Sequence, residues 1–164
     1  MQTIIRKSKK EDLKAVQELN HQLFIHDKDF DSSLNINWPL EKEGEEYFKN
    51  KINEKDGVCF VAELNNEIVG YLVGSIIEPC YYRNIKKISE LENMIIKEDC
   101  RGKRIGEKLF KEFVEWSKLK KVERIKVSAY TSNESAIRFY KRIGFDFYAT
   151  ELEYIFLKKN TIKE

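Results

Sequence analysis

The sequence contains few of the residues that break a fold into pieces. Its 164 residues include two prolines and seven glycines, and neither type gathers into a linker that would divide the chain. Internal repeats and low-complexity tracts are also absent. A chain of this length can bury a hydrophobic core without help from metals or disulfides. We therefore expect residues 1–164 to form a single domain.

Cysteine, net charge and long apolar runs are scarce as well. Cys59, Cys80 and Cys100 are odd in number and lack metal-ligand spacing, which favours free thiols in a reducing compartment and no metal site. The 30 basic and 28 acidic residues leave a net charge of +2, too even to indicate a nucleic-acid partner. No apolar run approaches the roughly 20 residues of a membrane helix, and none follows the basic N-terminus as a signal would require. These features predict a cytoplasmic protein without a membrane partner.

The apolar residues that are present repeat with the periods of strands and helices. They predict strands at residues 3–6, 58–64, 67–77, 88–96 and 124–130, with an Asn65-Asn66 turn between the second and third. Helices are expected from a Ser8–Glu11 capping box, after Pro39, and over residues 105–118 and 134–143. Two closing strands are expected in residues 145–158. The order β-α-α-β-β-β-α-β-α-β-β predicts an α/β (α+β) fold with helices on the faces of a mixed sheet.

Residues 94–109 combine a strand, a basic turn and the start of a helix. The first turn of a helix leaves backbone N–H groups unpaired and positively polarised, which suits a phosphate. Gly102 and Gly106 allow a ligand to approach the backbone, and Arg101, Lys103 and Arg104 add positive charge. The segment is neither a Walker loop nor a dinucleotide-binding fingerprint, because it lacks the Lys-Ser/Thr pair and the third glycine. A basic surface loop at a helix start is the alternative.

A second informative segment covers residues 133–145. Ala136, Phe139, Tyr140 and Ile143 share one face of the expected helix, and Gly144 is suited to end it in a left-handed turn. Taken alone, that stripe is typical of a packed core. A tyrosine that faced a phosphate loop could also donate a proton.

Together, Arg101-Gly102-Lys103-Arg104-Ile105-Gly106 and Asn133-(x2)-Ala136-(x2)-Phe139-Tyr140-(x3)-Gly144-Phe145 resemble the two signature segments of the GNAT superfamily of acyl-CoA-dependent N-acyltransferases. The element order also matches, so the resemblance covers nearly the whole chain. It implies a single N-acetyltransferase domain whose mixed, mostly antiparallel sheet splays after the fourth strand. The family's loop pattern is Arg/Gln-x-x-Gly-x-Gly/Ala, and Arg104 departs from it at the middle glycine.

The resemblance also implies roles for particular residues, with acetyl-CoA as co-substrate and no metal. The backbone of Met94, Ile95 and Ile96 would pair with the pantetheine arm, and one of these N–H groups would polarise the thioester carbonyl. The pyrophosphate would bind the loop formed by Arg101, Gly102, Lys103, Arg104, Ile105 and Gly106. Asn133, Ala136 and Phe139 would contact the coenzyme from the other side. Tyr140 would protonate the leaving thiolate, and Glu92 is the first candidate for the general base, with Glu90 as the alternative.

The acceptor amine is less well indicated. The loop residues Asp27, Asp29 and Asp31 around Phe30 could favour a cationic amine such as a polyamine, an aminoglycoside or a peptide amine, but a merely solvated loop explains the same residues and is the favoured interpretation. Family members commonly pair, which implies a homodimer. A catalytically silent acyl-CoA-binding sensor is the alternative function. A nucleic-acid site at Lys118, Lys120, Lys121, Arg124 and Lys126 is disfavoured by neighbouring acids.

Overall fold

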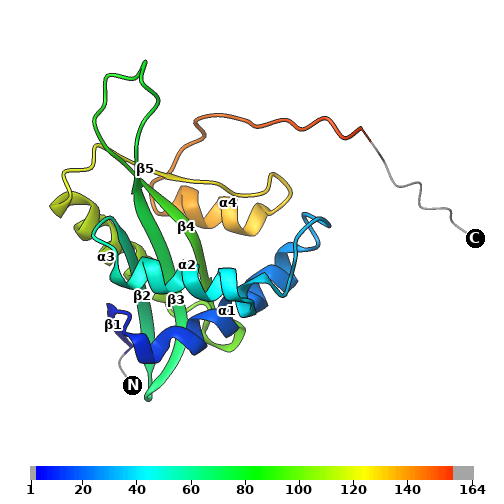
Figure 1. The fold of residues 1–164 in the computed structure, drawn as a ribbon, viewed down its shortest axis with the longest axis vertical. Coiled ribbons are helices and arrows are strands. Elements are labelled where there is room, and N and C mark those ends of the chain that lie inside the picture. The colour runs from blue at the N-terminus through cyan, green and yellow to red at the C-terminus, as the bar shows by residue number, and fades with distance from the viewer. Residues whose placement is uncertain (1–2, 157–164) are drawn as a thin grey trace, which may run out of the picture.

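The computed structural model describes residues 3–156 and shows a sheet covered by helices on both faces (Figure 1). The five strands lie side by side in chain order: β1 (Ile4–Lys7), β2 (Gly57–Leu64), β3 (Glu67–Ile77), β4 (Ile88–Ile96) and β5 (Arg124–Val127). Neighbouring strands are antiparallel except β4 and β5, which are parallel. The expected mixed, mostly antiparallel sheet is confirmed.

Alternating strand residues point to two separate layers of helices. On one face lie α1 (Leu13–Asp27) and α2 (Lys42–Asn53), whose Val16, Leu19 and Phe48 pack on Cys59, Val61, Tyr71 and Val73. On the other face, α3 (Ile105–Leu119) packs Ile105, Leu109, Phe113 and Trp116 against Val58, Phe60, Leu72 and Leu91, and α4 (Glu134–Arg142) lies beside it. Both faces of the central strands are therefore buried, which explains their continuous apolar runs.

The sheet opens along β4 because one residue interrupts its register. Val73 lies opposite Asn93 and Gly74 lies opposite Leu91, so Glu92 is the extra residue of a β-bulge. β5 pairs with β4 only from Ile88 to Leu91. In residues 3–156, the part of β4 after Leu91 has β3 as its only neighbouring strand. The expected splay after the fourth strand is thus present.

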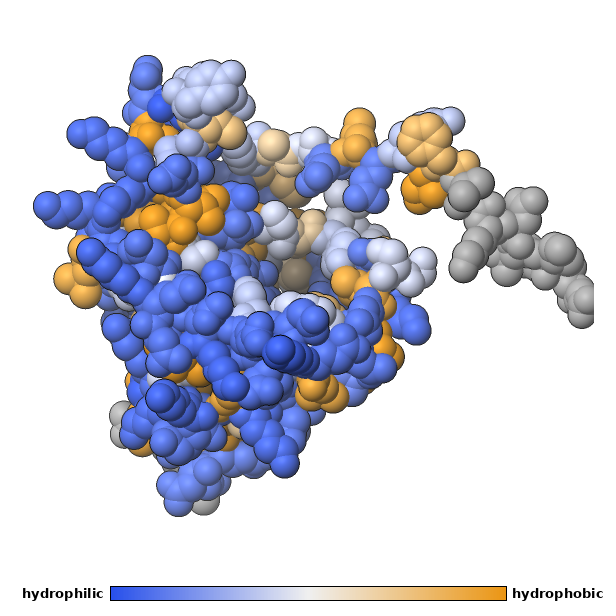
Figure 2. Space-filling view, in the orientation of Figure 1, coloured by the Kyte–Doolittle hydropathy of each residue, from blue (hydrophilic) through white to orange (hydrophobic). Residues whose placement is uncertain are grey.

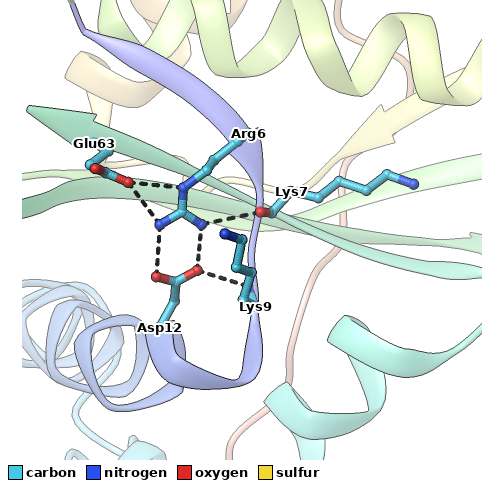
Figure 3. A network of polar contacts seen from close by, with 5 residues as sticks. All are labelled: Arg6, Lys7, Lys9, Asp12 and Glu63. Carbon is cyan, nitrogen blue, oxygen red and sulfur yellow. Dashed lines mark hydrogen bonds and ion pairs between the residues drawn. The ribbon is translucent and has the colours of Figure 1, made fainter. Parts of the chain in front are cut away.

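Several local features follow the sequence closely. Asn65 and Asn66 have φ of 53° and 63°, the backbone that a two-residue hairpin turn requires, and Gly144 ends α4 with φ of +104°. The expected Ser8–Glu11 capping box is wrong, because the Lys9 N–H donates to the Asp12 carboxylate instead (2.7 Å). The Asp12 carboxylate also accepts two hydrogen bonds from Arg6 (Figure 3). The observed pair, Lys9 and Asp12, thus lies one residue after the expected pair, Ser8 and Glu11.

The end of the chain departs most from expectation. No strand occurs in residues 145–156, where two closing strands were expected; residues 157 and 158 lie outside the described part. β5 also stops at Val127 rather than at residue 130. A strand is defined by its ladder of hydrogen bonds, and no neighbouring strand within residues 3–156 supplies one here. Short 3₁₀ turns occur at Lys10–Asp12, Trp38–Leu40 and Glu98–Cys100.

Within residues 3–156, none of the helices has both the length and the apolar character to cross a bilayer. The same residues contain no group of three or more His, Cys, Asp or Glu side chains arranged to hold a metal ion.

Candidate active site

The basic loop joins the end of β4 to the start of α3. Gly102 has φ of +76° and Arg104 has φ of 57°, so both take left-handed backbone. Glycine adopts that conformation without a Cβ penalty, which accounts for its frequency at the position that Arg104 occupies here. The first hydrogen bond of the i to i−4 helical pattern in α3 runs from the Lys108 N–H to Arg104 O (3.2 Å). The preceding N–H groups of α3 therefore lack intrahelical partners and can face an anion.

The side chains of the loop are tethered around this helix end. The Arg101 Nε donates to Ile96 O (3.1 Å), and the Lys103 Nζ donates to Asp99 O (3.1 Å). Arg101, Gly102, Lys103 and Arg104 are exposed, whereas Ile105 and Gly106 are buried. The loop thus presents positive charge to solvent beside a buried helix start, which is the arrangement of an oxyanion or phosphate cradle.

The backbone of β4 faces the opening at alternate residues. The Lys97 N–H donates to Val69 O on β3 (2.8 Å), and in an antiparallel pair the facing direction alternates. The backbone groups of Met94 and Ile96 therefore point away from β3, into the splay, while those of Ile95 point toward β3. Arg101 binding to Ile96 O fits that direction. Met94 and Ile96 can hydrogen-bond an extended ligand in the opening; the Ile95 side chain is buried in the core.

α4 meets the start of α3 on the other side of the opening. The Asn133 Oδ1 accepts from the Ala136 N–H (3.1 Å) and from the Ser135 hydroxyl (3.0 Å), so the side-chain oxygen caps α4. Phe139 packs over Gly106, where an added Cβ would lie 3.1 Å from the ring. The glycine is thus needed for the close approach of the two helices. Ala136 and Phe139 are half-buried beside it.

Tyr140 lies where the two layers of helices meet. Its ring packs against Phe139 (5.4 Å between centroids) and Phe145 (5.6 Å). Burial, with a smaller contribution from the charge of Asp27, raises the pKa of Tyr140 to about 12. The phenol is therefore protonated at neutral pH and can donate a proton.

Glu92, the bulge residue of β4, is surrounded by hydrogen-bond donors. Its carboxylate accepts from Lys51 Nζ (2.7 Å) and from the hydroxyls of Tyr47 and Ser75. Burial first, and then the charge of Glu92, raise the pKa of Tyr47, which stays protonated as a donor. Glu90, the alternative base, instead pairs with Lys126 (3.1 Å).

A chain of side-chain hydrogen bonds continues from this carboxylate into the protein. Asn93 Nδ2 donates to the Tyr47 hydroxyl (3.4 Å), and the Tyr71 hydroxyl donates to Asn93 Oδ1 (2.5 Å). Asn20 Nδ2 in turn donates to the Tyr71 hydroxyl (2.6 Å). Glu92 is therefore connected through hydroxyl and amide groups to the buried middle of α1.

The end of α1 brings acidic and aromatic groups to the same opening. Burial is the main cause that raises the pKa of Tyr71, Tyr130 and Tyr140. The charge of Asp27 contributes at all three, and that of Asp31 contributes more at Tyr130. Phe30 stacks on Tyr130 (5.7 Å), which follows β5. Asp27 and Asp31 are thus the carboxylates of this loop whose charges act on the tyrosines around the opening.

Other aromatic residues differ in how close they lie to Glu92 and the opening beside β4. Phe24, Trp38 and Tyr47 form a row at 5.8 and 5.6 Å between ring centroids, adjoining Glu92 through Tyr47. Tyr81 and Tyr82 are exposed in the β3–β4 loop. Tyr154 is exposed, in the last described segment, which runs away from the body of the protein (Figure 1).

Some functional candidates could not be found from the sequence. Tyr47 and Lys51 lie four residues apart on α2, a spacing that places them on one helix face but does not connect them with Glu92. A groove of about 540 Å³ between α3 and α4 adjoins the basic loop. Its lining residues are Arg104, Glu107, Phe110, Lys111, Val114, Arg142 and Ile143. Arg142 belongs to the second signature segment, but only the pairing of the helices places it beside Arg104.

The thiols lie outside this chemistry. Cys59 and Cys100 are buried, and burial raises the pKa of Cys59 to about 12 and that of Cys100 above its usual value. A raised pKa keeps a thiol protonated and weakly nucleophilic at neutral pH. The raised pKa of Cys59 and that of Cys100 are both consistent with direct transfer that forms no cysteinyl intermediate.

Comparison with known proteins agrees with this geometry. A model of the acetyltransferase (GNAT) family matches residues 13–145, and the chain belongs to that family. Its sequence is 29% identical over 102 residues to an uncharacterized N-acetyltransferase of Methanocaldococcus jannaschii, covering 61% of this chain and 44% of that protein. It is 31% identical over 102 residues to the spore coat polysaccharide biosynthesis protein SpsD of Bacillus subtilis, covering 62% of this chain and 32% of that one. The chain thus matches less than half the length of these two relatives.

Solved structures show the same fold. A mutant of the BH1408 protein from Bacillus halodurans superposes with a TM-score of 0.82 at 22% identity, covering 94% of this chain and 99% of that one. An aminoglycoside acetyltransferase, AAC(6')-Iy, bound to a bisubstrate analogue has a TM-score of 0.77 at 15% identity, covering 94% and 98%. A predicted acetyltransferase of Clostridium acetobutylicum with acetyl-CoA has a TM-score of 0.73 at 22% identity, covering 94% and 96%.

Proposed function

We propose that this protein is an N-acetyltransferase that moves the acetyl group of acetyl-CoA to a primary amine by direct attack within a ternary complex. The strongest support is the convergence of three elements on one opening. These are the basic loop at the start of α3, the outward-facing backbone of β4, and the protonated Tyr140 on α4. Residues 1–164 would act as one N-acetyltransferase domain.

The coenzyme would bind along this opening. Its pyrophosphate would lie against the N–H groups from Gly102 to Gly106 with charge supplied by Arg101, Lys103 and Arg104. The pantetheine arm would then extend beside Met94, Ile95 and Ile96, with the outward N–H groups of Met94 and Ile96 as its hydrogen-bond partners. The Asn133 amide, whose oxygen is used by the α4 cap, would offer Nδ2 to the arm from the other side, where Ala136 and Phe139 form the wall.

The transfer requires the movement of two protons. The amine nitrogen attacks the thioester carbonyl carbon, and a β4 N–H stabilises the charge on its oxygen. The C–S bond then breaks, the sulfur leaves with its electron pair, and Tyr140 donates a proton to it. Glu92 takes the proton lost by the amine, passed through the Tyr47 or Ser75 hydroxyl that already binds its carboxylate.

The acceptor would be a cationic amine. The negative charge of Asp27 acts on Tyr140, and the stacked rings of Phe30 and Tyr130 add aromatic faces. Carboxylates and aromatic faces both attract ammonium groups. A polyamine, an aminoglycoside or the amine of a basic peptide fits that environment. AAC(6')-Iy is an aminoglycoside N-acetyltransferase by name, and it shares its fold with this chain.

We further propose a cytoplasmic homodimer without nucleic-acid or membrane partners. The basic residues from the end of α3 to β5 support the absence of a nucleic-acid partner, because two of them are paired with acids. Lys118 pairs with Glu115 (2.8 Å) and Lys126 pairs with Glu90 (3.1 Å). Salt-sensitive retention on DNA or RNA would contradict it.

Thiol release from acetyl-CoA across a panel of amines tests the function. The panel contains spermidine, aminoglycosides, amino acids and basic peptides, with acetyl-CoA alone as the blank. Release with the cationic amines and not with neutral amino acids is the expected result. Tight binding of acetyl-CoA by calorimetry with no release from any amine would contradict the transferase and favour a coenzyme sensor.

A further inference from the structure

One lysine of α2 turns its side chain into the protein rather than toward solvent. The side chains of Lys42 and Lys49, on the same helix, are 83% and 51% exposed, on the mainly hydrophilic surface that covers α1 and α2 (Figure 2). The side chain of Lys51 is only 14% exposed, and its Nζ donates to Glu92 Oε1 (2.7 Å). The Lys51 amine therefore touches the carboxylate to which we assign the proton of the acceptor amine.

The neighbours of Lys51 hold this amine at the site. Its Nζ lies 5.2 Å from the centre of the Tyr47 ring, and the hydroxyls of Tyr47 and Ser75 bind the same carboxylate. Within residues 3–156, Lys51 is the only cation that forms an ion pair with Glu92. The protein thus supplies an amine of its own in direct contact with the candidate base.

The β4 bulge brings that amine close to the expected position of the thioester. Glu92 and Asn93 both turn toward the side of α1 and α2, at the point where β4 has lost its pairing with β5. Met94, whose outward N–H would bind the thioester oxygen, follows two residues after Glu92, roughly 7 Å along the strand. A lysine amine sits on a flexible four-carbon stem, so rotation of that stem can carry Nζ from Glu92 toward the carbonyl carbon.

We propose that the enzyme acetylates its own Lys51 when no other amine occupies the site. The inference rests on the proposed function, because it uses the same coenzyme site, base and acid. Its co-reactant is acetyl-CoA, and its products are Nε-acetyl-Lys51 and the free thiol of the coenzyme.

The reaction moves two protons off the Lys51 nitrogen. The first passes from the ammonium to Glu92 and on to water, and the neutral Nζ then attacks the thioester carbonyl carbon. The second leaves for Glu92 as the C–N bond forms. The C–S bond breaks with its electron pair on sulfur, Tyr140 protonates that sulfur, and water returns a proton to the phenol.

Acetylation changes the charge that the site presents to an acceptor. The Lys51 ammonium neutralises Glu92 and repels a cationic amine, whereas acetyl-lysine is uncharged and leaves the carboxylate free to attract one. Self-acetylation therefore prepares the site for a cationic acceptor. Lys51→Gln, which imitates acetyl-lysine, should have a lower KM for spermidine than Lys51→Arg, which keeps the charge. An equal or higher KM would contradict this preparation.

The first experiment incubates the purified protein with isotope-labelled acetyl-CoA, without an amine, and measures acetylation of each lysine by peptide mass spectrometry. Counting labelled groups and any carried over from the cell, acetylation of Lys51 should exceed that of Lys49 by about 10-fold or more. Lys49 is the matched control because it lies on the same helix but pairs with Glu45. Equal acetylation of the two lysines would indicate an uncatalysed reaction and would overturn the proposal.

Variants of the base and the acid test whether the site catalyses this transfer. Glu92→Gln should slow acetylation of Lys51 by roughly 10²-fold and leave that of Lys49 unchanged. Tyr140→Phe should also slow it, and circular dichroism confirms that both variants are folded. Acetylation of Lys51 at the wild-type rate in both variants would overturn the proposal.

A mixing experiment distinguishes transfer within one chain from transfer between chains. Wild-type protein is mixed with a differently tagged Gly106→Trp chain, which is expected not to bind acetyl-CoA. Lys51 of the Gly106→Trp chain should stay unmodified while Lys51 of the wild-type chain is acetylated. Equal acetylation of both chains would overturn transfer within the site.

Thiol release with the amine panel, measured on the same preparation, separates this inference from the proposed function. Release with spermidine while Lys51 stays unmodified would overturn self-acetylation alone and leave the transferase in place. Absence of both thiol release and acetyl-Lys51 would overturn the two together.

Discussion

At the scale of single residues, Tyr140 is kept protonated by its aromatic neighbours. Phe139 and Phe145 pack against its ring, and burial raises its pKa to about 12. A thiol such as that of the coenzyme has a pKa of roughly 8.5, so the phenol gives up its proton only as charge develops on the sulfur. Donation coupled to C–S cleavage is the role that such a group can fill.

Replacing Tyr140 with Phe should slow turnover while leaving coenzyme affinity nearly intact. Loss of a positioned acid typically costs about 10²-fold or more in rate. Steady-state kcat with the best amine, and calorimetric titration with acetyl-CoA, measure the two effects separately. Tyr148→Phe is the matched control, since that ring is exposed and lies beside arginines rather than the opening. A Tyr140→Phe enzyme as fast as the wild type would remove this residue from the acid role.

Glu92 carries the second prediction at this scale. Glu92→Gln keeps the shape of the side chain but cannot accept the amine's proton, so kcat should fall by roughly 10²-fold. Steady-state kinetics with the best amine measure the loss. Glu90→Gln serves as the control because Glu90 pairs with Lys126 instead. A Glu92→Gln enzyme as fast as the wild type would mean that the amine loses its proton by another route and that Glu92 only positions Lys51 and Tyr47.

At the scale of elements, the start of α3 depends on space above Gly106. Gly106→Trp should abolish acetyl-CoA binding, because a side chain at this position collides with Phe139 and fills the cradle. Calorimetry measures the loss, and circular dichroism checks that the fold persists. Gly102→Ala is a useful contrast: nothing lies within 4 Å of its added Cβ, but φ of +76° strains it, so stability should fall by about 1 kcal/mol with weaker binding rather than none. Unchanged affinity in Gly106→Trp would mean that the coenzyme binds elsewhere.

The junction of β1, α1 and β2 depends on one arginine. Arg6 binds the Asp12 carboxylate through two nitrogens (2.6 and 2.9 Å) and also binds Glu63 (Figure 3). The hydrogen bond from Arg6 is the main reason that the pKa of Asp12 lies below its usual value. The ion pair therefore stabilises the fold above pH of about 4 and loses its effect as the pH falls through the lowered pKa.

Arg6→Leu should lower the free energy of unfolding by about 3 kcal/mol at pH 7, since it leaves the buried Asp12 carboxylate without its cation. Denaturant unfolding at pH 7 and at pH 3 measures the effect, and the variant should lose less stability than the wild type between them. Lys42→Met, which removes the exposed Lys42–Glu46 pair, should cost less than about 0.5 kcal/mol. Equal losses in the two variants would mean that the Arg6 network does not secure α1.

At the scale of the whole molecule, the coenzyme would bridge the two halves of the splayed sheet. Acetyl-CoA at 100 times its dissociation constant should therefore stabilise the protein by about 2.7 kcal/mol, which corresponds to roughly 5–10 °C in Tm. Thermal unfolding monitored with and without acetyl-CoA checks the shift. Gly106→Trp is the control and should show none. A wild-type protein whose Tm ignores the coenzyme would contradict binding in the opening.

The features that the sequence by itself determined are local. Helical bonding joins residues four apart, so the start of α3, the cap at Asn133 and the left-handed end at Gly144 could all be read from short segments. The apolar periods likewise indicated which faces pack. The family, the order of elements up to α4 and the basic loop followed from these patterns.

Contacts between distant residues were decided only by the tertiary structure. Tyr47 and Glu92 are 45 residues apart, and no pattern in the sequence brings the hydroxyl to that carboxylate. The effect of the Asp27 charge on Tyr140 and the outward direction of the Met94 and Ile96 backbone also depend on how strands and helices assemble. The end of the chain is the clearest case. Two closing strands were predicted in residues 145–158, but residues 145–156 contain none, because a strand exists only where another strand supplies its hydrogen bonds.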